Sequence, residues 1–349
     1  MPPCESNGRS SGLAQIADTE PTILVAGGAG YIGSVLVPRL LASGYRVRVL
    51  DLLWWGEESL AEVRDRIELV QADLRDLPET ALDGICGVIN LAGLSNDVTA
   101  EYDPAANWQM NALATEALAD ACVRRGVRRL VFASSCSLYD GLAAGMHDES
   151  APIRPRAAYA LSKRYAEEAL LARRRRGLEP VILRFGTVYG WSPRMRYDLV
   201  VNRFVRDALL HGKLNLHGGG WMRRPLADVD DVAHVLIAAL QAPAGLVAGE
   251  ILNVLSSNHL VRELALLVAR AVRLAGRTVT LEETSLPRLA RDYECSNAKL
   301  VARVGFTPTR SLAQAVADLL SRIDFEDPAV LADPRYENIR WLELMRAGA

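Results

Sequence analysis

Cysteine is scarce in this sequence and never closely paired. Its five cysteines lie far apart in 349 residues, and no two of them form a Cys-x-x-Cys motif. Zinc sites and disulfide frameworks need closely spaced or regularly repeated cysteines. We therefore expect five reduced thiols, no metal site and a cytoplasmic protein.

A long apolar run is also missing. No segment approaches the ~20 consecutive apolar residues that span a bilayer. Residues 1–20, which contain several Ser, Gly and Pro, have no apolar signal core. We expect no membrane contact and a disordered leader over residues 1–20.

The chain has no excess of positive charge. Its 40 Lys and Arg residues stand against 42 Asp and Glu, which gives a net charge of −2. Nucleic-acid binders attract phosphate through positive charge, so we expect no nucleic-acid partner. The length exceeds the roughly 250 to 300 residues at which a single core stops growing, which predicts a large domain and a smaller one.

What the sequence does contain is an alternation of short apolar runs with amphipathic segments. The runs cover 22–26, 46–52, 67–72, 87–91, 129–134, 180–185 and 251–254, and the helical segments of the first half lie near 31–43, 104–125 and 156–176. Such alternation implies right-handed crossovers and a parallel sheet covered on both faces. We predict an α/β fold with a doubly wound parallel sheet (Rossmann domain) over 21–195, to which 228–254 returns. A smaller C-terminal α/β lobe over 196–227 and 255–349 would bind the substrate.

A glycine-rich loop connects the first predicted strand to the first helix. It contains Gly27, Gly30, Tyr31, Ile32 and Gly33. Glycines at this spacing allow a tight turn and bring backbone N–H groups, at the positive end of a helix, close to a pyrophosphate. The loop predicts a dinucleotide site.

Acidic residues end the second and third predicted strands. Asp51 can accept hydrogen bonds from both hydroxyls of an adenosine ribose and would repel a 2′-phosphate, which favours NAD over NADP. Asp73 and Leu74 lie where they could meet adenine, although capping of a helical turn explains Asp73 equally well.

A phenol and an ammonium group stand four residues apart at Tyr159 and Lys163, on one face of a predicted helix. Ser135 closes an apolar strand at the carboxyl edge, where open α/β sheets bind ligands. The order of glycine loop, strand-terminal serine and Tyr-x-x-x-Lys is far more specific than any one of these motifs.

Together these motifs resemble the extended short-chain dehydrogenase/reductase family, in particular its NAD-dependent epimerase/dehydratase group, which acts on nucleotide sugars. The resemblance covers about residues 22–323. It rests on Gly27–Gly33, Asp51, Asp73-Leu74, Asn90–Gly93, Asn111, Ser134–Tyr139, Tyr159–Lys163, Arg184–Gly190 and Arg224–Ala233.

The resemblance implies roles for the reactive residues. Tyr159 would be the acid/base, Lys163 its electrostatic partner and a ribose ligand, and Ser135 the hydroxyl that binds the reacting oxygen. A free phenol has a pKa of ~10, and bringing it near 7 requires about 4 kcal/mol. Lys163 and the positive nicotinamide ring of bound NAD would supply it.

The resemblance also implies which residues hold each ligand. Leu91, Ala92, Gly93 and Asn111 would contact the cofactor, although Asn111 also suits a polar residue satisfied on its own helix. The substrate would meet Ser95, Asn96, Thr187 and Arg224, of which Arg224 would grip a nucleotide diphosphate. Asn202 would either contact the substrate or be an ordinary helical residue.

Departures from the family pattern bear on the reaction. The 4,6-dehydratases have an Asp-Glu pair directly after the catalytic hydroxyl, where this chain has Cys136 and Ser137. The turn at Gly190 has no following His of the kind used by C3/C5 epimerases. The leading hypothesis is an enzyme, a nucleotide-sugar epimerase that transiently oxidises C4. A nucleotide-sugar 4-ketoreductase or dehydrogenase with exchangeable NAD is the alternative, and a dehydratase or a non-catalytic NAD-binding sensor fits the motifs less well.

The helices predicted near 104–125 and 156–176 carry long apolar faces. In the family that the chain resembles, these helices pair across a two-fold axis as a four-helix bundle. We therefore expect a homodimer.

Overall fold

The computed structural model describes residues 20–142, 145–285, 291–323 and 327–347. All of the leader predicted over residues 1–20 except Glu20 lies outside these ranges. Within them, no helix combines the length and apolar character needed to cross a membrane.

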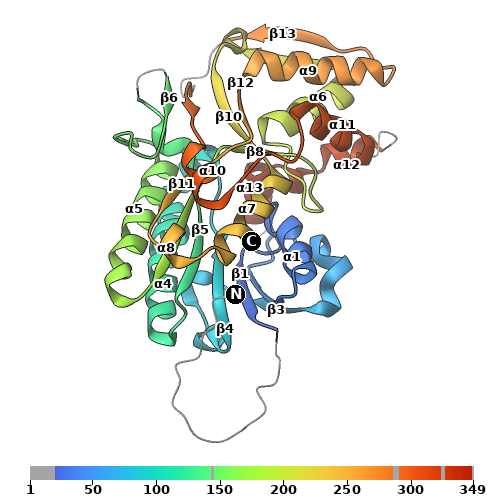
Figure 1. Cartoon of the computed structure of the whole chain (residues 1–349). Coiled ribbons are helices and arrows are strands. Elements are labelled where there is room, and N and C mark those ends of the chain that lie inside the picture. Colours follow the sequence, from blue (N-terminus) through green and yellow to red (C-terminus); the bar gives the residue numbers. More distant parts are fainter. Residues whose placement is uncertain (1–19, 143–144, 286–290, 324–326, 348–349) are drawn as a thin grey trace, which may run out of the picture.

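A seven-stranded sheet forms the centre of the molecule (Figure 1). Its strands are β1 (Thr22–Ala26), β2 (Arg46–Asp51), β3 (Ile67–Gln71), β4 (Ile85–Asn90), β5 (Arg129–Ser135), β7 (Glu179–Phe185) and β11 (Ile251–Val254). The spatial order is β11-β7-β5-β4-β1-β2-β3, and every neighbouring pair is parallel. The doubly wound sheet is confirmed, and each strand coincides with an apolar run of the sequence. Because the chain leaves β1 toward β2 on one side and later toward β4 on the other, a crevice opens at the carboxyl ends of β1 and β4.

Helices cover both faces of this sheet. On one face lie α1 (Gly33–Ala42) and α7 (Val229–Gln241), and on the other α4 (Ala114–Arg125) and α5 (Ala158–Ala172). Ile23 and Val25 of β1 are buried in the first of two apolar clusters, and Leu24 and Ala26 in the second. A strand buried on both faces requires the continuous apolar run that the sequence shows.

The segment predicted as one helix over 104–125 is divided in the structure. It consists of α3 (Pro104–Asn107), the π-helical turn η4 (Trp108–Leu113) and α4, and it follows α2 (Asp97–Tyr102). A π turn adds one residue to a helical turn, a local change that apolar periodicity does not reveal. The helix predicted over 156–176 likewise ends as the 3-10 turn η6 (Arg173–Arg176) after α5.

The C-terminal lobe lies above the carboxyl edge of the sheet in Figure 1. One of its sheets contains β8 (Thr187–Tyr189), β10 (Arg223–Asp228) and β12 (Ser257–Leu260), and another pairs β9 (Lys213–His217) with β13 (Thr280–Thr284). Three helices pack beside them, α6 (Val200–His211), α9 (Val261–Leu274) and α11 (Leu312–Arg322). Their buried side chains belong to the same apolar cluster as β1 and α1, so the lobe and the sheet share one continuous core.

The shorter elements complete the described chain. They are η1 (Glu58–Arg66), η2 (Leu74–Asp76), η3 (Glu79–Leu82), η5 (Cys136–Tyr139), β6 (Met146–His147), η7 (Gly218–Gly220), α8 (Ala244–Val247), β14 (Glu294–Cys295) and α10 (Ala298–Val304).

The C-terminal segment returns to the first part of the chain. After α12 (Pro328–Ala332) and η8 (Pro334–Tyr336), α13 (Asn338–Ala347) packs against α2. Leu342 of α13 shares an apolar cluster with Leu94 and Met110. The sequence assigns this helix to the substrate lobe, whereas its apolar contacts place it beside the glycine loop domain.

Four of the five cysteines lie in the described ranges. Cys122, Cys136 and Cys295 are free and buried, whereas Cys86 is disulfide-bonded. The expectation of reduced thiols is therefore wrong for Cys86, which is half-buried near the start of β4.

Candidate active site

A cleft of about 480 Å³ opens at the carboxyl edge of the sheet, between the sheet and the lobe. It continues into a narrower pocket of about 100 Å³ beside the ends of β2 and β3. The two cavities share Gly27, Gly30, Trp55 and the loop 91–94, so one elongated ligand can occupy both.

Most predicted site residues line one of these cavities. Those in the cleft are Gly27, Gly30, Tyr31, Ile32, Gly33, Leu91, Ala92, Gly93, Ser95, Asn96, Ser135, Tyr159, Lys163, Thr187 and Arg224. Those in the pocket are Gly27, Gly30, Asp51, Asp73, Leu74, Leu91, Ala92 and Gly93. Asn111 and Asn202 line neither cavity.

The glycine loop has the shape of a phosphate cradle. Gly27 has a φ of +80°, and a Cβ there would lie 2.7 Å from the backbone nitrogen of Ala92. A Cβ on Gly33 would lie 2.5 Å from the carbonyl oxygen of Gly27. Within the described chain, the backbone N–H groups of Tyr31, Ile32 and Gly33 donate no hydrogen bond. They stand at the start of α1 and are available to an anion, so the loop fits a dinucleotide pyrophosphate.

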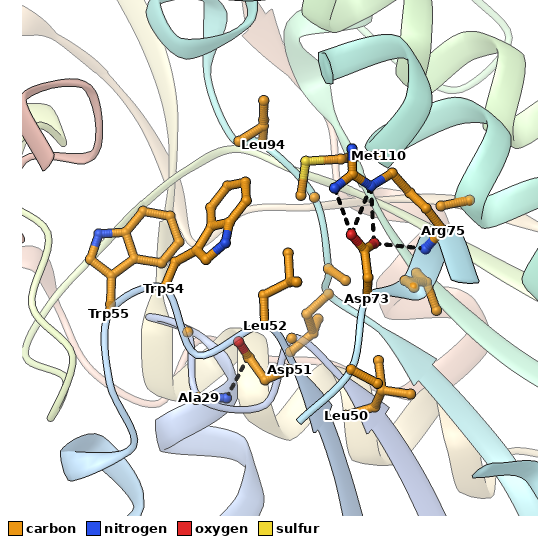
Figure 2. Close-up of a pocket in the computed structure, with 18 of the residues that line it drawn as sticks. Ala29, Leu50, Asp51, Leu52, Trp54, Trp55, Asp73, Arg75, Leu94 and Met110 are labelled. Carbon is orange, nitrogen blue, oxygen red and sulfur yellow. Dashed lines mark hydrogen bonds and ion pairs between the residues drawn. The ribbon is translucent and has the colours of Figure 1, made fainter. Parts of the chain in front are cut away.

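Asp51 lies in the narrower pocket (Figure 2). Its two oxygens each accept one backbone N–H, from Ala29 at 3.0 Å and from Leu53 at 2.9 Å. Burial raises the pKa of Asp51, and these two hydrogen bonds oppose the rise. Each oxygen keeps a lone pair for a ribose hydroxyl. Trp54 and Trp55 flank the pocket on one side, as Figure 2 shows, and offer aromatic surface to the ligand.

Asp73 is engaged by its own segment, on the opposite side of the pocket in Figure 2. It accepts from the Arg75 backbone N–H at 2.8 Å, as the cap of η2, and pairs with the Arg75 guanidinium at 2.5 Å. Of the two alternatives for Asp73, the cap is present in the structure. Arg48 is paired in turn with Glu68 at 2.7 Å. Because Arg75 and Arg48 are both paired with carboxylates, neither guanidinium is free to bind a 2′-phosphate.

Ser135, Tyr159 and Lys163 converge in the cleft. Ser135 ends β5, and the other two lie one turn apart near the start of α5. The Ser135 side chain interacts with the Tyr159 phenol and lowers its pKa, and Nζ of Lys163 lies 5.8 Å from the centre of the Tyr159 ring. Nζ also donates to the carbonyl oxygen of Ala133 at 2.9 Å, which holds the ammonium group beside the phenol.

Burial governs the proton affinities of this group. It raises the pKa of Tyr159, and the charge of Arg196 and the hydrogen bond with Ser135 oppose the rise. Burial lowers the pKa of Lys163 to about 8, opposed by the charge of Glu167. The phenol is therefore protonated at neutral pH in this state. A further cation beside it, such as an oxidised nicotinamide ring, would lower its pKa.

A buried ion pair supports these residues from behind. Arg184 of β7 and Glu167 of α5 are in contact at 2.7 Å, and the Ser134 hydroxyl donates to Glu167 at 2.5 Å. These bonds fasten α5 to the ends of β5 and β7. They fix the position of Lys163, which lies one turn before Glu167.

The loop that contains Ser95 and Asn96 is bonded to a segment that the sequence analysis missed. Arg196 pairs with Asp198 through two contacts, of 3.0 and 2.6 Å, and donates to the Ser95 hydroxyl at 2.8 Å. Asn96 donates to Asp198 at 2.8 Å. These four side chains join the loop after β4 to the loop after β8 and form a polar wall of the cleft.

Asn111 and Asn202 lie behind the loops of the site. The Asn111 amide donates to the carbonyl oxygen of Leu94 at 2.8 Å. Asn202 donates to the Tyr31 hydroxyl at 3.1 Å and accepts from the Gly190 backbone N–H at 3.0 Å. Both side chains are fully buried, and they brace the backbone that lines the cavities.

Arg224 lies on the lobe side of the cleft, beside Arg291. Its guanidinium donates to the backbone carbonyl of Arg291, whose own side chain pairs with Asp97. The second carboxylate oxygen of Asp97 is buried and has no hydrogen-bond partner in the described chain. This end of the cleft combines two guanidinium groups with an acceptor that a ligand hydroxyl can satisfy.

The two residues after Ser135 do not face the cleft. Cys136 donates to the carbonyl oxygen of Arg184 at 3.2 Å and packs with Tyr293 and Cys295. Ser137 is also buried. A reacting group in the cleft would therefore meet neither side chain.

Several residues that line the cavities escaped the sequence analysis, among them Trp54, Trp55, Arg194, Arg196 and Asn338. The two arginines follow the turn at Gly190, at the carboxyl edge, and this position could have marked them. Asn338 had no comparable signal, because nothing local in the sequence shows that α13 returns to the glycine loop.

Comparison with known proteins decides the family. Residues 23–254 match the NAD dependent epimerase/dehydratase family. The chain belongs to this family. The resemblance inferred from the motifs is thereby confirmed, and the protein is an NAD-dependent enzyme of the epimerase/dehydratase type.

Its relatives carry out different reactions. UDP-glucose 4-epimerase of Mycolicibacterium smegmatis is 32% identical over 306 residues, which cover 84% of this chain and 96% of that protein. dTDP-glucose 4,6-dehydratase of Streptomyces griseus is 30% identical over 311 residues, covering 84% and 92%. The structure of MoeE5 in complex with UDP-glucose and NAD matches with a TM-score of 0.75 and 30% identity, covering 86% of this chain and 97% of that one. Family membership alone therefore does not select the reaction.

Proposed function

We propose that this protein is a nucleotide-sugar epimerase that inverts C4 through transient oxidation. The observation that carries the proposal is the make-up of the cleft. Among the residues that the structure describes, it brings together Ser135, Tyr159 and Lys163, which would move a proton to and from a sugar hydroxyl, without a second acid and base beside them.

In this mechanism Tyr159, as the phenolate, removes the proton from the C4 hydroxyl while Ser135 hydrogen-bonds to the same oxygen. The Lys163 ammonium group favours the phenolate. Bound NAD supplies the chemistry of hydride storage and return. The keto sugar rotates in the cleft so that its other face meets the cofactor. Tyr159 then returns the proton to the oxygen on the inverted C4.

The residues present fit NAD. The free N–H groups of the glycine loop suit its pyrophosphate, and Asp51 suits the adenosine ribose. Lys163 would reach the second ribose. On the lobe side, Arg224 would bind the diphosphate of the substrate, and the oxygen of Asp97 that has no partner among the described residues would accept from one of its hydroxyls.

Dehydration fits this cleft less well, although dehydratases are among the relatives. Elimination of water needs a proton donor and a base in addition to Tyr159. Among the described residues that line the cleft, carboxylates occur only at Asp97 and Asp198, and each is paired with an arginine. Such pairing favours the ionised form, which cannot donate a proton.

The reaction is tested with UDP-glucose and dTDP-glucose, the sugars named for the relatives, deuterated at C4. We expect a C4 epimer of unchanged mass that keeps its deuterium, no incorporation from D₂O on carbon, and no net NADH. Stoichiometric NADH with an oxidised sugar would establish the dehydrogenase alternative. A product lighter by one water would establish dehydration.

We also propose a homodimer formed through a four-helix bundle of η4, α4 and α5 from two copies. Leu113 and Leu161 are 43% and 40% exposed, and Trp108, itself 38% exposed, contacts Tyr165 with ring centres 5.0 Å apart. Burial of these side chains supports association. Light scattering should give a dimer mass, and Leu161→Asp should reduce it to the monomer. A monomer mass for the unaltered chain at all concentrations would refute the dimer.

A further inference from the structure

Arg194 is a buried cation without a counter-ion. It is 6% exposed, and no carboxylate lies within ion-pair distance of its guanidinium among the residues that the structure describes. Burial lowers the pKa of Arg194 to about 9 and the charge of Arg196 lowers it further, while the charges of Asp198 and Asp51, which lie beyond ion-pair distance, oppose this. Arg196, two residues later, is paired with Asp198. A buried charge of this kind calls for an anion.

Neutral contacts hold the Arg194 guanidinium in place. It donates to Oδ1 of Asn338 at 2.7 Å and to the carbonyl oxygen of Met195 at 3.2 Å. Its Cζ lies 4.5 Å from the centre of the Trp55 ring. These contacts orient the side chain, but none of them is a carboxylate, and the guanidinium lines the cleft without a direct ion pair among the described residues.

The segment that carries Arg194 is fastened to the glycine loop. The Ser192 hydroxyl donates to the carbonyl oxygen of Tyr31 at 2.7 Å and lies 2.9 Å from the Ser34 hydroxyl. The Arg194 backbone N–H in turn donates to Ser192 at 3.3 Å. Arg194 and the glycine loop line the same cleft, so the charge stands where the loop would hold a pyrophosphate.

We propose that Arg194, oriented by Asn338 of α13, is a second ligand of the dinucleotide pyrophosphate, beside the N–H groups of the glycine loop. A guanidinium fork matches two phosphate oxygens and supplies the positive charge that the loop lacks. The substrate diphosphate has a separate cation on the lobe side, Arg224. The inference depends on NAD binding and is independent of the proposed reaction at C4.

The proposal predicts that the C-terminal helix contributes to retention of NAD. Asn338 joins Arg194 to the Ser95 hydroxyl, to which it donates at 3.1 Å. The indole N–H of Trp341 donates to the carbonyl oxygen of Trp54 at 2.7 Å. Through Asn338 and Trp341, α13 thus contacts two segments that line the cofactor cavities.

The test is calorimetry on the full chain, freed of nucleotide, with NAD, ADP-ribose and adenosine. Arg194→Met should weaken NAD and ADP-ribose about 10- to 100-fold and leave adenosine unchanged, because adenosine has no phosphate. Arg194→Lys should fall between Arg194→Met and the unaltered chain. The matched control is Arg335→Met, which removes a positive charge from neighbouring η8 where the side chain is 48% exposed and paired with Asp333. It should bind all three ligands normally.

A second variant and the melting temperature distinguish loss of a phosphate contact from loss of folded structure. Asn338→Ala keeps the charge but frees the guanidinium, and it should speed dissociation of NAD from the holoenzyme with a smaller loss of affinity. Arg194→Met should not lower the melting temperature without nucleotide, because it removes a buried charge that has no ion-pair partner among the described residues. Unchanged affinity for NAD and ADP-ribose would overturn the proposal, as would an equal loss for adenosine. Weaker binding of UDP alone to the NAD-loaded enzyme would assign Arg194 to the substrate instead.

Discussion

The two walls of the cleft are built in different ways. The cofactor wall consists of turns that follow β1, β2 and β3, and each turn is a short continuous piece of sequence. The opposite wall is assembled from distant pieces: Ser95 bonds to Arg196, 101 residues away, and Arg194 to Asn338, 144 residues away. The first wall depends on backbone geometry that glycines allow. The second wall depends on ion pairs and hydrogen bonds between side chains that lie far apart in the sequence.

The largest expected effect is on proton transfer, where the two walls meet. Tyr159→Phe should lower turnover about 10²- to 10⁴-fold while NAD affinity stays nearly unchanged, because the ring remains and only the transferable proton is lost. Lys163→Ala should reduce both turnover and NAD affinity, because the Lys163 side chain would also contact the ribose of NAD. Activity of the Phe variant above a few per cent of normal would remove Tyr159 from the proton path.

The opposite wall is expected to depend on its buried ion pair for stability. Arg196→Met leaves Asp198 buried without its partner and should lower the free energy of unfolding by about 3 to 5 kcal/mol, measured by urea titration. The double variant Arg196→Met/Asp198→Leu should recover most of the loss. Because Arg196 also lowers the pKa of Tyr159, turnover by the folded single variant should need a higher pH. An unchanged urea midpoint would show that the ion pair does not stabilise this wall.

The cofactor wall is expected to control dinucleotide choice. Asp51→Asn removes the charge and replaces one of the two acceptor oxygens with an NH₂ donor, and should reduce the preference for NAD over NADP by about 1.5 to 3 kcal/mol. Affinity for UDP should not change, because Asp51 lines only the narrower pocket. Equal binding of the two dinucleotides by the unaltered protein would contradict the role of Asp51.

The smallest effect concerns the stability of the protein without ligands. Burial lowers the pKa of Lys163 to about 8, below the ~10.4 of an unfolded chain, so protonation of Lys163 favours unfolding. Lys163→Met should stabilise the nucleotide-free protein by about 2 kcal/mol at neutral pH, partly offset by the lost bond to Ala133.

The pH dependence of this stability difference shows whether the charge of Lys163 causes it. The destabilisation by Lys163 is fully present below pH 8 and disappears as the pH rises toward 10.4, so the melting temperatures of the two proteins should converge there. A constant difference across this range would mean that packing, rather than charge, causes the gain.

The sequence alone determined the sheet and the glycine loop of the cofactor wall. Strands buried on both faces appear as apolar runs, and the glycine loop requires a residue without Cβ at Gly27 and Gly33. Ser135, Tyr159 and Lys163 could be found for a similar reason, because each stands at a fixed place on a strand end or a helix turn. Each of these features constrains residues that are close together in the sequence, so each produces a recognisable sequence pattern.

Only the tertiary structure decided the opposite wall. Arg194 and Arg196 look alike in the sequence, yet one is paired with a carboxylate and the other is left for an anion. Asp73 could cap a turn or meet adenine until the position of Arg75 was known, and Asn338 joined the site only because α13 packs beside Leu94. Pairing and burial of charges depend on which segments meet in space, and no spacing along the chain records that.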